Sequence, residues 1–150
     1  MKKNNNKGFT LVELIVVLVI LAILAAILVP ALLGYIDRAR EKQYVLNAKS
    51  AYTAAQAELS SLYGENKSAS DIMSRKTTVQ ATADVPSGTN FSFSPKGGDA
   101  ASGAVSSNHA AYTVGTATYY ENGVTLKFDG SAWIKDDSTS SSSETYTLWQ

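Results

Sequence analysis

The sequence contains no cysteine and a single histidine in 150 residues. The absence of cysteine excludes disulfide bridges and thiolate-ligated zinc or iron–sulfur centres. One histidine, His109, cannot form a multi-histidine metal site. No combination of nucleophile, base and acid can be picked out along the chain, so we expect a protein that is not an enzyme and that needs no cofactor and no metal.

The chain also lacks an excess of charge of either sign. Thirteen basic and thirteen acidic side chains cancel, which argues against a generally basic nucleic-acid binder and against an acidic tail. The length predicts one domain with at most an additional element. Apolar residues are concentrated near the N-terminus, whereas the remainder is rich in Ser, Thr, Ala and Gly. The chain is therefore best read as two parts.

The N-terminal part is dominated by sixteen consecutive apolar residues, Leu14–Val29, and Glu13 is the only charge between Lys7 and Asp37. As a helix, residues 14–36 would be about 34 Å long, enough to cross the hydrocarbon core of a bilayer. A buried helix of a soluble core is disfavoured because the rest of the chain is too polar to surround it. A cleaved secretory signal is the other alternative, but the run is long for one and no Ala-x-Ala site follows it.

A compact motif precedes this run. Residues 7–14 read KGFTLVEL, after a short basic leader and before an apolar segment that contains Pro30. This unit resembles the processing signature of type IV pilins and of the related pseudopilins of type II secretion and DNA-uptake systems. The resemblance is strong from residue 7 to about residue 30 and loose along the helix to about residue 64.

The resemblance implies a processing step. Prepilin peptidase would cut between Gly8 and Phe9 on the cytoplasmic side, remove residues 1–8 as a leader, and methylate the new amino group of Phe9. The hydrophobic segment, residues 9–36, would stay on the mature protein as a transmembrane and filament-core helix. Gly8 suits such a site because a residue without Cβ lets a protease approach the backbone closely.

The resemblance also implies roles for three residues further along. Glu13 would pair with the N-terminal amine of Phe9 in another subunit and set the register of assembly, since each buried charge is costly alone. An unpaired carboxylate at the level of the lipid headgroups is the alternative. Pro30 removes a helical hydrogen bond and would kink the helix of an isolated subunit. In filaments of the family, the stretch before this proline, here residues 22–30, can lose helical order, and Gly34 is a second weak point where the helix could break.

The second part, residues 37–150, is predicted to be a globular head. Apolar residues spaced three and four apart predict that the helix continues over residues 37–63, with Gly64 as its C-terminal cap; they are Val45, Ala48, Tyr52, Ala55, Leu59 and Leu62. A long dimeric coiled coil is the alternative, but this stripe is short and rich in alanine. Residues 64–89 are expected to form a connecting loop with one short helix from Ser70 to about Lys76.

Residues 90–150 are predicted to hold a small antiparallel sheet and a C-terminal loop. Alternating patterns predict strands at 90–94, 111–120, 124–128 and 131–135, with a further terminal strand at 145–149. Asn122-Gly123 and Asp129-Gly130 are hairpin turn signals. The adjacent carboxylates Asp136-Asp137 could bind calcium, although a solvated loop is the favoured interpretation. The expected fold is α+β: the pilin fold, with the second half of a long helix packed on the sheet.

The function that these observations favour is that of a structural subunit of an extracellular type IV pilus, used for adhesion, surface motility or aggregation. A pseudopilin of a type II secretion or DNA-uptake system is the first alternative, and an unprocessed single-pass membrane protein with an external binding domain is the second. The expected partners are like subunits in a helical filament, prepilin peptidase, and the assembly platform with its ATPase. We expect a membrane precursor that later reaches the cell surface, and no nucleic-acid partner unless the chain serves DNA uptake.

Overall fold

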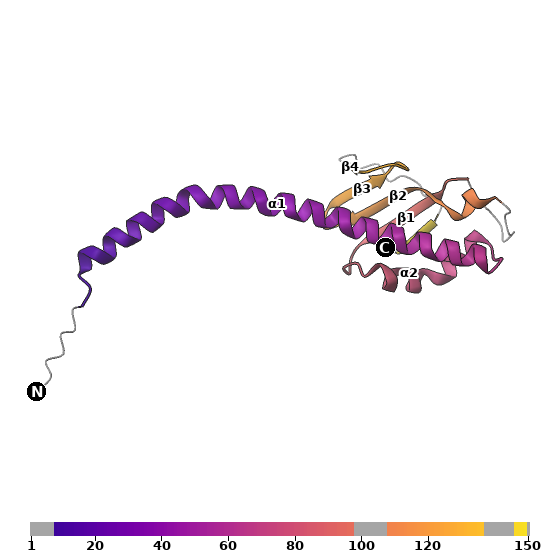
Figure 1. Ribbon diagram of the computed structural model, residues 1–150, viewed down its shortest axis with the longest axis horizontal. Helices are drawn as coiled ribbons and strands as arrows, with labels where there is room; N and C mark the ends of the chain where they lie inside the picture. The colour runs from indigo at the N-terminus through magenta and orange to yellow at the C-terminus, as the bar shows by residue number, and fades with distance from the viewer. Residues whose placement is uncertain (1–7, 98–107, 137–145, 150) are drawn as a thin grey trace, which may run out of the picture. The chain divides into compact units, whose positions relative to one another are not determined.

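The computed structural model describes residues 8–97, 108–136 and 146–149. The chain divides into two compact units, Met1–Glu41 and Lys42–Gln150, which are described separately. Helix α1, Leu11–Gly64, begins in the first unit and ends in the second (Figure 1). The expected division lay between residues 36 and 37. The observed one lies later because the side chains of residues 37–43 are all exposed, and Tyr44 is the first that is partly buried.

The first unit consists of the apolar part of α1. Each described side chain from Phe9 to Glu41 is exposed, including every large apolar one. An apolar helix without a polar face must be covered by lipid or by other protein. By length and composition, α1 is able to cross a membrane, and none of its most apolar stretch is buried within the chain. This finding argues against the alternative of a helix in the core of a soluble protein.

Helix α1 is uninterrupted at Pro30 and Gly34. A proline removes its own N–H from the helical ladder, and its ring crowds the carbonyl four residues earlier, but the helix continues on both sides of Pro30. Neither residue therefore ends the helix in the single chain. The loss of helical order within a filament remains a prediction.

In the second unit, the remainder of α1 packs on the sheet through its apolar stripe. Ala48, Ala55, Leu59 and Leu62 are fully buried, and Val45 and Tyr52 are partly buried against the same core. The predicted stripe is thus confirmed. Two further alanines, Ala51 and Ala54, are also buried, so the buried face is wider than the predicted one, and its small side chains let the helix lie close to the sheet.

The C-terminal end of α1 is closed by Asn66 rather than by Gly64. The N–H of Asn66 donates to the carbonyl of Tyr63 at 3.1 Å, and the N–H of Lys67 donates to the carbonyl of Leu62 at 2.9 Å. This is the double hydrogen bond of a Schellman motif, in which the first of the two donor residues has a left-handed conformation. Asn66 supplies it, with a φ of 56°, because asparagine tolerates this conformation better than most residues.

The segment expected as a connecting loop is mostly helical. A 3-10 helix, η1 (Ala69–Arg75), is capped by Ser68 and followed by α2 (Lys76–Ala83). Apolar residues at helical spacing bury one side of each, Ala69 and Ile72 in the first and Val79 and Ala83 in the second. Two such contacts in so short a segment give little periodic signal in the sequence, and packing on the core supplies the stability instead.

Within the described residues, the sheet has five antiparallel strands in the order β4-β3-β2-β1-β5 (Figure 1). They are β1 (Asn90–Pro95), β2 (Val114–Glu121), β3 (Val124–Phe128), β4 (Trp133–Asp136) and β5 (Tyr146–Trp149). The terminal strand that the sequence suggested is present and pairs with β1. The expected strand from residue 111 begins instead at Val114, because residues 109–112 form a 3-10 turn, η2 (His109–Tyr112).

The two hairpins follow their turn signals. Asn122 and Gly123 both have positive φ, 48° and 84°, as a two-residue type I′ turn requires. In the second hairpin, Asp129 Oδ1 accepts the N–H groups of Ser131 and Ala132 at 2.8 and 2.9 Å. These two backbone donors lower the pKa of the Asp129 carboxyl.

One face of the sheet supplies the core beneath α1. Its buried residues are Phe91, Phe93, Ala117, Tyr119 and Leu126. In the strand register, Phe91 is paired with Tyr119, and Tyr119 is paired with Leu126, so these three side chains lie on the same face. A long N-terminal helix over a five-stranded antiparallel sheet is the α+β architecture that was expected of the pilin fold.

Candidate functional site

The predicted cleavage site lies just before α1. Residues 8–10 are in an irregular segment, and the helix begins at Leu11. The side chain of Phe9 is 81% exposed. A Cβ added to Gly8 would meet nothing within 4 Å, and its φ is not in the range that favours glycine. The fold of the single chain therefore does not account for a glycine at position 8, and a requirement imposed by a partner remains the better explanation.

Thr10 and Glu13 close the first turn of α1 by reciprocal hydrogen bonds. The backbone N–H and the hydroxyl of Thr10 both donate to Glu13 Oε2, at 2.8 and 2.7 Å, and the N–H of Glu13 donates to Thr10 Oγ1 at 3.3 Å. This arrangement is a capping box, in which two backbone donors at the helix N-terminus are satisfied by side chains. The negative charge also lies at the positive end of the helix dipole.

Thr10 is a site residue that the sequence interpretation did not single out. The pattern Thr-x-x-Glu immediately before an apolar run is the recognised signal of a capping box, and it is present in residues 10–13. Glu13 therefore has a local role in addition to its expected role in assembly. The two roles are compatible because both bonds from Thr10 end on Oε2, and no described residue donates to Oε1.

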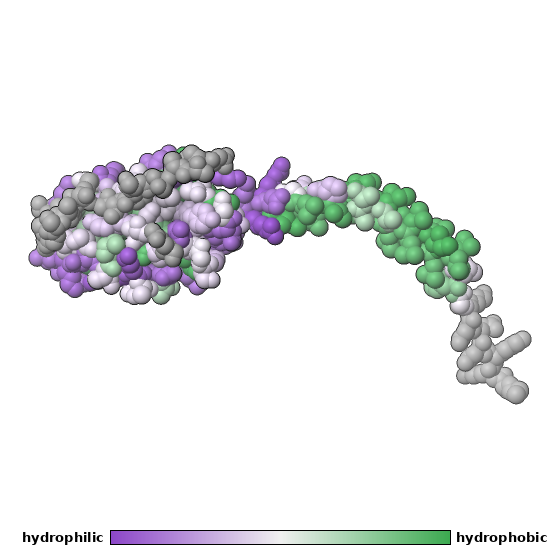
Figure 2. Space-filling model, turned by 180° about the vertical axis from the view of Figure 1, so that it is seen from behind, coloured by the Kyte–Doolittle hydropathy of each residue, from purple (hydrophilic) through white to green (hydrophobic). Residues whose placement is uncertain are grey.

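The apolar surface begins directly after this cap. Figure 2 shows the visible side of the segment as a mostly hydrophobic surface with a few paler residues. The exposed large apolar side chains extend from Leu11 to Ile36, which as a helix is about 39 Å. Gly8, Phe9 and Glu13 thus lie together at one end of this surface, whereas Pro30 and Gly34 lie toward its other end.

Several expectations fall outside the described residues. Residues 1–7 of the leader are not described, and neither are Asp137 and the serine-rich run after it. Asp136 is described: it belongs to β4, and its carboxylate forms an ion pair with Lys127 on β3 at 2.5 Å. Among the described residues, no group of three or more histidine or acidic side chains is placed to hold a metal ion.

Comparison with protein families identifies the N-terminal segment. Residues 3–29 match the family model of the prokaryotic N-terminal methylation motif, which is the signature of type IV prepilins. The match covers the predicted cleavage site, the capping box and the apolar run up to Val29. Comparison with curated proteins and with solved structures gives no match. The motif marks a substrate of prepilin peptidase, and with the exposed apolar helix it fits a membrane-anchored precursor.

Proposed function

We propose that this chain, with the type IV prepilin signature at residues 3–29, is a structural subunit of an extracellular type IV pilus and not an enzyme. The observation that carries the proposal is the position of the motif: it directly precedes a long apolar helix that the chain leaves uncovered. Lipid covers this helix before assembly, and the helices of neighbouring subunits cover it afterwards. The filament would serve adhesion, surface motility or aggregation.

Processing and assembly are linked through the end of the helix. Cleavage between Gly8 and Phe9 creates a positively charged amine beside the first turn, and methylation keeps that charge. In an apolar environment, such an amine needs a counter-charge. The Oε1 atom of Glu13 in a neighbouring subunit is suited to supply it while Oε2 remains bonded to Thr10. Subunits would then dock at the axial position where both charges are satisfied.

Two other functions compete with this proposal. A pseudopilin of a type II secretion or DNA-uptake system would use the same motif, the same helix and the same assembly platform with its ATPase. An unprocessed single-pass membrane protein with an external binding domain would use only the helix. The methylation motif implies processing, and therefore favours a filament subunit over the unprocessed single-pass protein.

The test is the intact mass of the protein recovered from its own cells. Protein from the membrane and from sheared surface filaments should lack residues 1–8 and carry one added methyl group, about 14 Da. Full-length mass in both fractions would contradict processing and favour the single-pass alternative. Processed protein in the membrane, with none in filaments seen by electron microscopy, would favour the pseudopilin.

A further inference from the structure

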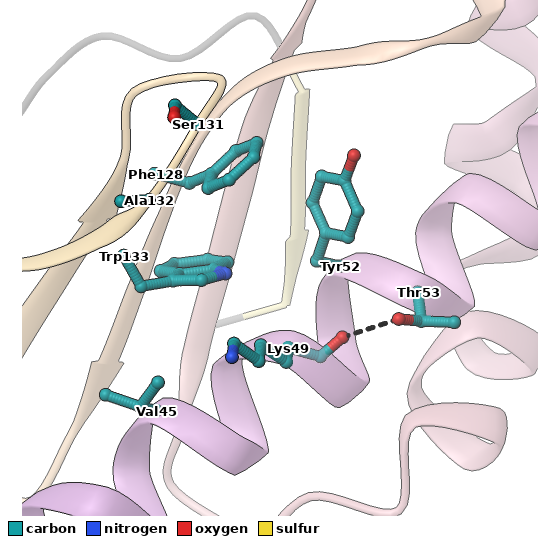
Figure 3. A pocket seen from close by; sticks show the side chains of 8 residues that line it. All are labelled: Val45, Lys49, Tyr52, Thr53, Phe128, Ser131, Ala132 and Trp133. Carbon is teal, nitrogen blue, oxygen red and sulfur yellow. Dashed lines mark hydrogen bonds between the residues drawn. The ribbon is translucent and has the colours of Figure 1, made fainter.

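An open pocket of about 540 Å³ lies in the second unit, between α1 and the turn that joins β3 to β4 (Figure 3). Three partly buried aromatic side chains line it: Tyr52 from α1, Phe128 from β3 and Trp133 from β4. The ring centroids of Tyr52 and Phe128 are 4.9 Å apart, and those of Phe128 and Trp133 are 5.4 Å apart. The rings form a continuous aromatic wall that remains partly open to solvent.

Polar side chains surround this wall. Lys49 and Thr53 from α1 and Ser131 from the turn lie at its rim (Figure 3). The hydroxyl of Thr53 donates to the backbone carbonyl of Lys49 at 2.8 Å, which leaves its oxygen able to accept a hydrogen bond. None of the described residues that line the pocket is acidic, so the ammonium group of Lys49 gives the rim a positive charge.

The pocket is held in shape by the second hairpin. Asp129 fixes the turn through the N–H groups of Ser131 and Ala132. Phe128 and Trp133 are paired directly across β3 and β4, so both rings have defined positions before a ligand arrives. Preformed pockets of several hundred Å³, with apolar walls and a few polar groups, are the usual form of small-ligand sites.

We propose that this pocket binds an acidic saccharide, meaning a pyranose unit that carries a carboxylate or a sulfate. The apolar face of a pyranose ring packs against aromatic rings such as Trp133. The sugar hydroxyls find partners in Thr53 and Ser131, and the acidic group faces Lys49. The volume of about 540 Å³ lies within the usual range of small-ligand pockets.

A second copy of the chain is a less suitable occupant. A stable protein interface buries about 800 Å² on each partner, from roughly 20–30 residues, whereas the lining of this pocket comprises eight of the described residues. The proposal extends the adhesive role of the filament, yet the pocket lies within one unit of one chain. Its test uses the unassembled protein and can therefore fail while the filament proposal stands, or succeed while that proposal fails.

The experiment measures saccharide binding to the full-length protein in detergent micelles by ligand-observed NMR titration. The probes are 3′-sialyllactose and a sulfated disaccharide, with lactose as the neutral control. We expect saturable binding of at least one acidic probe at roughly millimolar concentration, and binding of lactose about two- to fivefold weaker. No saturable binding of either acidic probe, or equal binding of lactose, overturns the proposal.

Variants locate the site. Lys49→Gln should weaken the acidic probe about two- to fivefold and leave lactose unchanged, whereas the matched change Lys42→Gln, on the same helix outside the pocket, should have no effect. Trp133→Ala should weaken every probe about tenfold. If Trp133→Ala does not fold by circular dichroism, Lys49→Gln decides the question alone. Unchanged binding of the acidic probe by Lys49→Gln overturns the proposal. The proposal is also overturned if the protein binds no saccharide but self-associates, and Trp133→Ala abolishes that self-association.

Discussion

The side-chain amide of Gln56 pairs with the backbone at Val114 as a neighbouring strand would. Its Oε1 accepts the N–H of Val114 at 2.9 Å, and its Nε2 donates to the carbonyl of Tyr112 at 2.9 Å. Helix α1 thereby fixes the point where β2 begins. The second half of the helix is thus an integral part of the head, which depends on it for hydrogen bonds as well as for its apolar core.

The first prediction concerns this pairing. Gln56→Glu removes the donor to Tyr112 and places a carboxylate beside its carbonyl oxygen, so the free energy of unfolding should fall by about 1–3 kcal/mol. The measurement is urea unfolding of the detergent-solubilised protein, followed by tryptophan fluorescence. Gln80→Glu, at an exposed position of α2, is the matched control. Equal midpoints for the two variants would show that the pairing contributes no stability.

The second prediction concerns Gly8. A side chain at this position meets no other atom of the chain within 4 Å, so Gly8→Val should fold and insert normally. Processing should nevertheless stop, because the peptidase needs close access to the backbone. Gly34→Val, at another position where an added Cβ meets nothing, is the control and should still be processed. Mass spectrometry distinguishes them, and a Phe9 N-terminus in Gly8→Val would contradict the assignment of the cleavage site.

The third prediction separates the two roles of Glu13. Thr10→Val breaks the capping box but keeps the carboxylate, so it should cost about 1 kcal/mol of helix stability and leave filaments nearly normal in number. Glu13→Gln keeps the cap, since glutamine serves equally in a capping box, but it loses the charge and should give clearly fewer filaments. Glu13→Ala loses both and should give almost none, because a buried amine is left unpaired at a cost of roughly 3–5 kcal/mol.

Filaments counted by electron microscopy, with processed subunit in the membrane as the control, decide between these roles. If Thr10→Val loses filaments while Glu13→Gln keeps them, the carboxylate serves as a helix cap only. The assignment of Glu13 to subunit register would then be wrong.

The fourth prediction concerns pH. Nη2 of Arg75 donates to both carboxylate oxygens of Glu65, to Oε1 at 2.8 Å and to Oε2 at 2.6 Å. Nζ of Lys67 lies 2.8 Å from Oε2 of the same carboxylate. Chiefly through Arg75, these contacts lower the pKa of Glu65 to about 2. A group whose pKa is lower in the folded state stabilises above its unfolded value and loses that contribution as the pH falls through the folded value.

Between pH 4.5 and about pH 2, the head should therefore lose stability, and Glu65→Gln should lose less over the same interval. The urea midpoint, measured across this range for both proteins, tests the difference. Parallel curves would mean that the ion pair with Arg75 does not contribute to folding.

The long periodic elements of this fold were predictable from the sequence, whereas the short ones were not. The stripe that ends in Leu59 and Leu62 repeats over several turns, and the Asn122-Gly123 signal admits few backbone conformations. By contrast, η1 and α2 each bury only two apolar residues, so their helical form is set by packing on the core. The closure of α1 by Asn66 illustrates a further limit, because a nearby glycine is the stronger signal of a helix end and yet is not the residue used.

At the candidate site, the important residues were predicted from the sequence, but the hydrogen bonds between them were not. Gly8, Phe9 and Glu13 stand out through their motif, which the methylation-motif match at residues 3–29 contains. The hydrogen bonds of Thr10 follow from the spacing of residues 10 and 13 alone. The saccharide pocket had no sequence signal, since Tyr52 and Trp133 are 81 positions apart and are brought together only by the packing of α1 on the second hairpin.

The capping box has a consequence for the order of events in processing. Both of its residues lie downstream of the predicted cut, and the first helical hydrogen bond, from the N–H of Leu14 to the carbonyl of Thr10 at 3.3 Å, lies downstream as well. Removal of the leader would therefore leave intact the hydrogen bonds that the described residues form at the start of α1. The first turn of α1 would then be formed before the cut, and the cut would add a positive charge next to it, so maturation would act as an electrostatic switch on a helix that is already built.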